Sequence, residues 1–170
     1  MLLQPSKCLL TVKNVSAKKY YVITKSVKST IMKNIEEYCK DKNIKLTPVR
    51  LKVLELLQNE KSGLGAYRIL DLLREAGFNS QPPVAYRALD FLVEHGFVHK
   101  IESQNSFVAC TDPGVQHSPV FMICKKCDSV SEAPTFETAS NISDALIATG
   151  FNVEQTIIEA EGVCSTCSEH

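Results

Sequence analysis

The chain has 170 residues, and its 19 Lys and Arg are balanced by 19 Asp and Glu. Apolar residues make up 44% and charged residues 22%, a composition typical of a globular protein rather than a disordered one. The longest unbroken apolar run, residues 119–124, is far too short for a helix that crosses a bilayer. These numbers exclude a transmembrane helix and leave room for one ordinary domain or two small ones.

Charge is distributed unevenly along the chain. Residues 1–31 contain six Lys and no acidic residue, whereas residues 111–170 contain two Lys against nine acidic residues, a net charge of −7. We interpret the first segment as a basic arm without regular structure: either a nucleic-acid-binding arm or a stretch upstream of a true start at Met32. We place a first domain at 32–112 and a second at 113–170.

The apolar spacing of the first domain is helical. It predicts four helices. The first begins at Met32, and the other three span about 48–60, 65–76 and 82–95. Thr47 followed by Pro48 is a typical start of a helix, and Gly77 and Gly96 are typical residues at helix ends.

The fourth helix has an outward face that could read DNA. Its apolar residues share one side and leave Tyr86, Arg87 and Asp90 on the other. An aromatic residue and an arginine at the start of a short exposed helix suit contacts to bases and phosphates in a major groove. An ordinary solvated helix face explains the same pattern equally well.

A β-hairpin is predicted after the fourth helix. Two apolar runs, 97–101 and 107–110, flank a polar turn, and helices followed by a hairpin are typical of a winged helix-turn-helix. If Gln104 and Asn105 form the tip of the turn, paired residue numbers sum to 209, and His99 lies directly opposite Cys110. Opposed residues have Cβ atoms about 4.5–5.5 Å apart, close enough for both side chains to bind one metal ion.

The second domain is expected to be a small unit of strands and one helix. The pattern predicts a helix before Gly150 and short strands at Val120–Ile123, Ser129–Glu132 and Phe151–Ile158. A segment of fewer than 60 residues buries a thin core. We therefore expect it to need a metal ion or a partner chain.

Two Cys-x₂-Cys pairs predict that metal site. They are Cys124 with Cys127 and Cys164 with Cys167, called here the four-cysteine cluster. Each pair sets two sulfurs on one side of a metal, and two pairs complete a tetrahedral zinc shell with no open position, so this zinc is expected to be structural. Two disulfides would use the same residues, but nothing in the sequence signals export, and intracellular thiols stay reduced.

A second set of metal-binding residue types lies in and after the hairpin. It consists of His99, Cys110, His117 and Glu132, called here the mixed cluster. Nitrogen and thiolate donors favour Zn²⁺ over Mg²⁺, Ca²⁺ or Mn²⁺, which prefer oxygen. Each residue alone has an ordinary structural explanation. Together, at the join between the two domains, they indicate a hinge that a metal locks.

Several motifs resemble the ferric uptake regulator family. They are Leu46-Thr-Pro-Val-Arg50, the run from Pro82 to Leu92, and Gly96-Phe-Val-His-Lys100, followed by the two Cys-x₂-Cys pairs. The resemblance covers about 32–167, and within the family the zinc-sensing members fit best. It implies an α+β protein with an N-terminal winged helix-turn-helix domain and a C-terminal α/β dimerisation domain held together by the zinc of the four-cysteine cluster.

The resemblance also implies a function. We expect a homodimeric cytoplasmic repressor that binds a palindromic operator in double-stranded DNA when zinc is bound and controls zinc uptake genes, with no enzymatic activity, small-molecule substrate or membrane partner. The mixed cluster corresponds to the regulatory zinc site, which gives two zinc ions per protomer. Tyr67 and Arg87 match positions that contact DNA, and we expect Arg50 to contact a phosphate. Asp71 and Arg74 match contacts between neighbouring dimers. An ordinary surface ion pair explains the last two equally well.

The sequence departs from the family pattern at three points. His117 stands alone where iron and peroxide sensors carry a histidine-rich run, which argues against iron. Val84 replaces a threonine whose hydroxyl could contact a phosphate. Arg68 adds a positive charge where an acid is common.

Three other functions stay open at this point. The chain could be a family member that senses iron, manganese or peroxide. It could be a zinc hydrolase, with Glu132 as general base; three protein ligands and a water would indicate this, whereas four protein ligands indicate a sensor. It could also be a zinc-binding adaptor that never contacts DNA.

Overall fold

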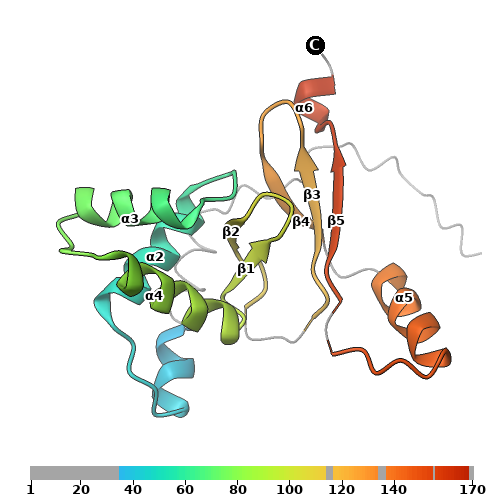
Figure 1. The fold of residues 1–170 in the computed structure, drawn as a ribbon, viewed down its shortest axis with the longest axis horizontal. Helices are drawn as coiled ribbons and strands as arrows, with labels where there is room; N and C mark the ends of the chain where they lie inside the picture. The colour runs from blue at the N-terminus through green and yellow to red at the C-terminus, as the bar shows by residue number, and fades with distance from the viewer. Residues whose placement is uncertain (1–34, 114–116, 134–136, 155, 169–170) are drawn as a thin grey trace, which may run out of the picture.

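The computed structural model describes residues 35–113, 117–133, 137–154 and 156–168. The predicted basic arm and the predicted helix start at Met32 lie outside these residues. Within the described part, no helix is long and apolar enough to cross a membrane. The architecture is α+β, as expected (Figure 1).

The helices of the N-terminal unit form where the sequence predicts them. Helical residues at 35–41 precede α2 (Pro48–Asn59), α3 (Ala66–Glu75) and α4 (Pro82–Glu94), each of which begins and ends within one residue of the prediction. The Thr47 hydroxyl accepts a hydrogen bond from the Arg50 N–H and caps α2. Gly77 and Gly96 adopt left-handed backbone conformations, with φ of 84° and 70°, just after α3 and α4 end.

These helices and the hairpin enclose one apolar core. Its side chains come from all four helical segments, which pack their apolar stripes against each other and against the first hairpin strand. Fully buried members are Ile35, Val53, Leu54, Ile69, Leu73, Leu89, Leu92, Phe97 and Val98.

The hairpin consists of β1 (Val98–Ile101) and β2 (Ser106–Ala109), joined by residues 102–105. The predicted register is wrong: His99 pairs with Val108, so paired numbers sum to 207. The turn is centred one residue earlier than expected, because Asn105 takes a left-handed conformation (φ 47°) directly before β2. Cys110 instead donates its backbone N–H to the carbonyl of Phe97. Since side chains alternate with period two, a two-residue shift keeps His99 and Cys110 on the same face of the hairpin.

The C-terminal unit is a three-stranded sheet with strand order β4-β3-β5. The strands are β3 (Val120–Cys124), β4 (Val130–Ala133) and β5 (Ile158–Gly162), and the helices are α5 (Glu137–Ala148) and the short α6 (Ser165–Ser168). The last predicted strand, Phe151–Ile158, is misplaced. The strand starts at Ile158 because it pairs in parallel with β3, from Val120 opposite Ile158 to Cys124 opposite Gly162. This pairing sets the two Cys-x₂-Cys pairs side by side.

The hairpin lies between the helices and the C-terminal sheet (Figure 1). One face of it packs on the helical core through Val98, Phe107 and Ala109. Its other face contributes Ile101 and Val108 to a second apolar cluster. The C-terminal sheet supplies the rest of that cluster, namely Phe121, Ile123 and Val130. The two units therefore meet through apolar contacts as well as through the polar groups described next.

Candidate metal centres and DNA-binding face

The structure brings the four residues of the mixed cluster together. His99 comes from β1, Cys110 follows β2, His117 precedes β3 and Glu132 lies on β4. One ligand atom of each residue lies within 4.8 Å of the others. The hairpin and the sheet thus each supply donors to a single point between the two units.

Two of the three distances inside the mixed cluster suit a metal ion. Glu132 Oε1 lies 2.7 Å from Nε2 of His117 and 3.6 Å from Nε2 of His99, while Cys110 Sγ lies 3.7 Å from Nε2 of His117. A tetrahedral zinc ion with bonds of about 2.0–2.3 Å separates its ligand atoms by roughly 3.3–3.8 Å. The 3.6 and 3.7 Å distances match this range, whereas the 2.7 Å contact between His117 and Glu132 is a hydrogen bond that would have to lengthen around an ion. The His99 Nε2 atom is buried without a hydrogen-bond partner among the described residues, as expected of an atom aimed at an ion.

The surroundings of the mixed cluster orient its carboxylate. The backbone N–H and the hydroxyl of Thr111 both donate to Glu132 Oε2 at 2.9 Å, which leaves Oε1 facing the histidines. Hydrogen bonds of this kind fix a metal-binding carboxylate before the ion arrives.

Burial sets the protonation states in the mixed cluster. It lowers the pKa of His99, and the Glu132 carboxylate offsets this only in part, so the imidazole is neutral and offers a lone pair. Burial, together with the negative charge of Glu132, raises the pKa of the Cys110 thiol to about 12. Cys110 therefore keeps its proton at neutral pH until a cation displaces it.

The four-cysteine cluster lies at the far end of the same sheet. Cys124 ends β3, and Cys127 follows in a turn. Cys164 directly precedes α6, and Cys167 lies within it. The sulfur atoms lie within 4.8 Å of one another, and those of Cys127 and Cys164 are 3.8 Å apart, the edge of a zinc tetrahedron. The described cysteines are all free thiols, so the disulfide alternative finds no support.

The four-cysteine cluster is preorganised by its own backbone. The N–H of Cys164 donates to the sulfur of Cys124 at 3.3 Å, and this bond, with others from the turn, lowers the pKa of Cys124 to about 6. Hydrogen bonds with the neighbouring thiols, first that of Cys164, raise the pKa of Cys167 to about 12. One sulfur is thus held as a thiolate while another stays protonated, a conflict that a bound dication removes.

The candidate DNA-reading residues lie on the surface of α3 and α4. Tyr67 and Tyr86 are 72% and 42% exposed, and Arg87 is exposed beside Tyr86. Arg50 is half-buried: its guanidinium lies 3.6 Å from the ring centre of Phe91 and donates to a backbone carbonyl. The structure therefore gives Arg50 a packing role, and its phosphate contact stays a prediction.

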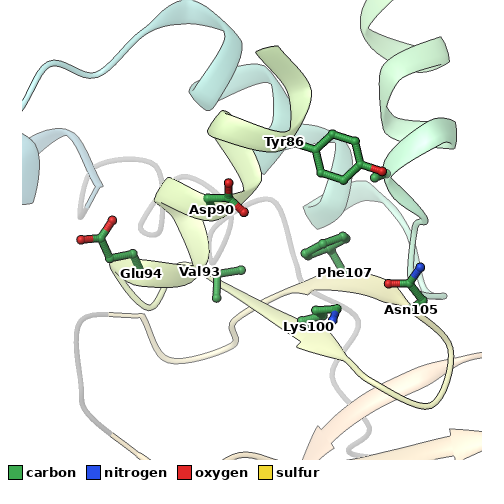
Figure 2. A pocket seen from close by; sticks show the side chains of 8 residues that line it. Tyr86, Asp90, Val93, Glu94, Lys100, Asn105 and Phe107 are labelled. Atoms are coloured by element: carbon green, nitrogen blue, oxygen red, sulfur yellow. The ribbon is translucent and has the colours of Figure 1, made fainter. Parts of the chain in front are cut away.

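A hollow of about 550 Å³ is lined by residues of α4 and the hairpin (Figure 2). Tyr86 lies at one end of it, and Asp90 and Glu94 line it further along α4, opposite Lys100 of β1. Because carboxylates repel phosphate, we expect the first half of α4 to approach DNA and its second half to stay away.

Two ion pairs on α3 include residues that the sequence analysis singled out. Arg74 lies 3.4 Å from Asp71 and also donates to the carbonyl of Ser80, and both members of the pair are about half exposed. Arg68 lies 3.3 Å from Glu75, which reduces the added positive charge that it brings to this face.

Sequence reasoning missed two polar residues that position the site. Thr111 holds Glu132, 21 residues away, and Glu159 of β5 accepts hydrogen bonds from the hairpin turn 56 and 57 residues away. No local pattern marks either residue, because each contact depends on how the two units meet.

Comparison with known proteins identifies the family of the chain. The sequence model of the ferric uptake regulator family matches residues 41–161. The chain belongs to this family. The Zinc uptake regulation protein of Escherichia coli (strain K12) is 40% identical over 152 residues, which are 85% of each chain, and the protein of the same name from Shigella flexneri matches equally.

Two solved structures extend this relationship to the fold. A structure described as a zinc uptake regulator complexed with zinc and DNA superposes with a TM-score of 0.77 at 42% identity, covering 84% of this chain and 95% of that one. The crystal structure of holo XcZur gives a TM-score of 0.76 at 38% identity, covering 84% and 99%. The likeness thus spans both units of the molecule.

Proposed function

We propose that this chain is a zinc-dependent transcriptional repressor. It binds palindromic operator DNA as a homodimer when zinc is bound, and it controls zinc uptake genes in the cytoplasm. The observation that carries the proposal is the mixed cluster, whose four donors come from the hairpin on one side and from the C-terminal sheet on the other. The relatives named as zinc uptake regulators, one of them solved with zinc and DNA, support the choice of metal and partner.

Two zinc ions per protomer follow from the two clusters. The four-cysteine cluster would hold a structural ion, because its four donors all belong to the C-terminal unit. The mixed cluster would hold the regulatory ion, because its donors lie on both sides of the junction. When bound there, zinc supplies the positive charge that lets a thiolate and a carboxylate lie side by side.

The residues of the mixed cluster perform the switch. On binding zinc, Cys110 would give up its proton to water and His99 would hold β1 against the sheet. Thr111, next to the cluster, would keep the Glu132 carboxylate pointed inward. We call the arrangement in which the hairpin is docked on the C-terminal sheet the closed arrangement, and we propose that DNA binds it best. An ion that binds the closed arrangement more tightly must then, by linkage, bind more tightly when DNA is present. A change from 1% to 99% occupancy of that arrangement requires a preference of about 5.5 kcal/mol.

DNA recognition would fall to the exposed faces of α3 and α4. Tyr86 and Arg87 suit the major groove, and Tyr67 suits the backbone. Arg50, half-buried on α2 against Phe91, would add a phosphate contact from its exposed part. The net charge of −7 on 111–170 keeps the other unit away from phosphate. Asp71 and Arg74 are exposed enough to exchange their ion pair for one with a neighbouring dimer on DNA.

The C-terminal unit would form the dimer. Apolar side chains of and after α5, namely Ile142, Leu146, Ile147 and Phe151, are 39–62% exposed within a single chain. Met122, on the sheet face that does not meet the hairpin, is 40% exposed as well. An apolar surface of this kind is typical of an obligate interface, and it corresponds to our second domain, 113–170.

The competing functions have less support. A hydrolase needs an open position on its zinc, and four protein donors within 4.8 Å leave none. Iron and peroxide sensors of the family carry a histidine-rich run where this chain has only His117. Manganese has little affinity for a thiolate such as that of Cys110.

Operator titrations with an Arg87→Ala variant test the proposal against the adaptor alternative. Loss of a base or phosphate contact should weaken binding to a palindromic operator duplex about tenfold or more at saturating zinc and fixed salt. Lys125→Ala removes the same charge from the C-terminal unit and should leave the affinity unchanged. Equal affinity of Arg87→Ala and the wild-type protein would favour the adaptor.

A further inference from the structure

One cross-strand row of the C-terminal sheet faces the hairpin with three side chains. Phe121 on the central strand pairs with Glu132 on β4 and with Glu159 on β5. Residues paired directly across neighbouring strands point to the same face. Glu132 belongs to the mixed cluster, and Phe121 packs against the hairpin and lies 5.5 Å, ring to ring, from His99. The third member of the row, Glu159, has no part in either metal cluster.

Glu159 holds the turn of the hairpin. Its Oε1 accepts the backbone N–H of Glu102 at 2.7 Å, and its Oε2 accepts the backbone N–H of Ser103 at 3.1 Å. Both oxygens of one carboxylate thus hold two successive amides, a charge-assisted and directional arrangement. These amides belong to the turn that follows β1, the strand that carries His99.

The carboxylate of Glu159 is ionised when it makes these bonds. Partial burial raises its pKa, but the hydrogen bonds from Ser103 and from the backbone of Glu102 outweigh this, and the net pKa lies below the usual value. The two carboxylates of the row therefore hold the hairpin at two points. Glu132 does so near one end of β1 through the metal site, and Glu159 does so at the turn without a metal.

We propose that Glu159 is a positioning residue that docks the hairpin turn on β5 and thereby lowers the zinc concentration at which the protein binds its operator. The inference rests on the proposed function and adds to it a contact that zinc does not make. A contact that favours the closed arrangement in the absence of zinc reduces the part of the conformational cost that the metal must supply. The zinc response is then set by the turn contact as well as by the four ligands.

The experiment compares the wild-type dimer, Glu159→Gln and Glu161→Gln. Glutamine keeps the size of Glu159 but removes the charge and one of the two acceptors. Glu161 lies two residues further along the same strand and pairs with Lys125 rather than with the hairpin, so it is the matched control. Operator binding is titrated against buffered free zinc, and hydrogen exchange of the 101–105 backbone is measured on the zinc-loaded protein.

We expect Glu159→Gln to need roughly three- to tenfold more free zinc for half-maximal operator binding. The variant loses a charge-assisted contact at a partly exposed site, so zinc must supply more of the free energy that closes the protein. The turn amides should exchange faster, while operator affinity at saturating zinc and the zinc content per protomer stay at wild-type values. Glu161→Gln should match the wild-type protein in every measurement. A role in folding alone would lower the plateau of operator binding or the zinc content instead.

The outcomes separate this inference from the function on which it rests. An unchanged zinc midpoint, unchanged exchange of the turn, or a lower plateau in Glu159→Gln would overturn the role of Glu159. Operator binding by the wild-type protein that does not respond to zinc would overturn the proposed function, whatever the variant does.

Discussion

The two candidate metal clusters of this molecule differ in where their ligands come from. The four-cysteine cluster takes all its ligands from the C-terminal unit, and three of its four residues are exposed or half-exposed. The mixed cluster takes its ligands from two units and lies at their junction, with the side chains of His99, His117 and Glu132 at most 13% exposed. An ion in the first can stabilise only the fold of one unit, whereas an ion in the second changes how two units are held together.

This difference indicates which of the two clusters can couple zinc binding to DNA binding. A site within one rigid unit stabilises the fold of that unit, but it does not select between different arrangements of the two units. A site shared between two units binds best in one of their arrangements, which is the condition for coupling between metal and DNA. Breaking each cluster in turn should therefore give two distinct defects.

The largest effect is expected from Cys127→Ser. Loss of one thiolate should abolish metal binding by the four-cysteine cluster, and the folding contribution of comparable zinc sites is on the order of 10 kcal/mol. The C-terminal unit should then unfold, and the dimer and all operator binding should be lost at any zinc concentration. Gel filtration and zinc content would show this, and a stable dimer with full operator affinity would contradict it.

A defect of the other kind is expected from Cys110→Ser. The hydroxyl is a poor zinc ligand, so the zinc needed for operator binding should rise by about a hundredfold while the dimer and one zinc per protomer persist. Cys39 is the matched control, because it is also buried but packs in the helical core away from either cluster. Cys39→Ser should retain the wild-type zinc response, and an equal loss in both variants would argue against the mixed cluster as the switch.

Zinc binding by the mixed cluster should depend on pH. With a pKa raised to about 12, Cys110 is protonated at and around neutral pH, and zinc binding must release that proton. His99, whose pKa is lowered, adds no second proton in this range. Apparent zinc affinity of the mixed cluster should therefore rise with pH by about tenfold per unit. Operator titrations in zinc buffers at three pH values would measure it, and a pH-independent midpoint would refute the assignment.

A smaller effect is expected from Thr111→Val. This change removes the hydroxyl that orients Glu132 but keeps the shape of the Thr111 side chain and its backbone N–H donor. Loss of such a bond typically weakens metal binding by about tenfold. Thr149→Val is a suitable control, because the Thr149 hydroxyl bonds to a carbonyl at the end of α5, remote from the clusters in sequence. Zinc competition with a chromophoric chelator would distinguish the two, and identical affinities would show that the backbone amide suffices.

The sequence predicts the local parts of the fold well. Caps and apolar stripes locate α2, α3 and α4 to within one residue, since these signals are carried by neighbouring residues. Strand positions are less secure, because pairing partners decide them. The turn conformation at Asn105 shifted the hairpin register by two residues, and the parallel partner β3 moved the last strand from Phe151–Ile158 to Ile158–Gly162.

The candidate site was predictable in its ligands and not in its surroundings. Cysteine, histidine and carboxylate types at the domain junction indicated the mixed cluster, and the proximity of His99 and Cys110 survived a wrong register because a two-residue shift keeps the face. The orienting contact of Thr111 and the turn contact of Glu159 depend on the docking of two units, which no local pattern encodes.

The most direct test of zinc control is a zinc-buffered operator titration of the wild-type dimer and a His99→Ala variant at fixed salt, with total zinc per protomer counted in parallel. We predict that wild-type binding to the palindromic duplex rises as zinc per protomer goes from one to two. The variant should stay at one zinc and bind weakly. Full operator binding by the wild-type protein at one zinc per protomer, unchanged by further zinc, would contradict zinc control through the mixed cluster.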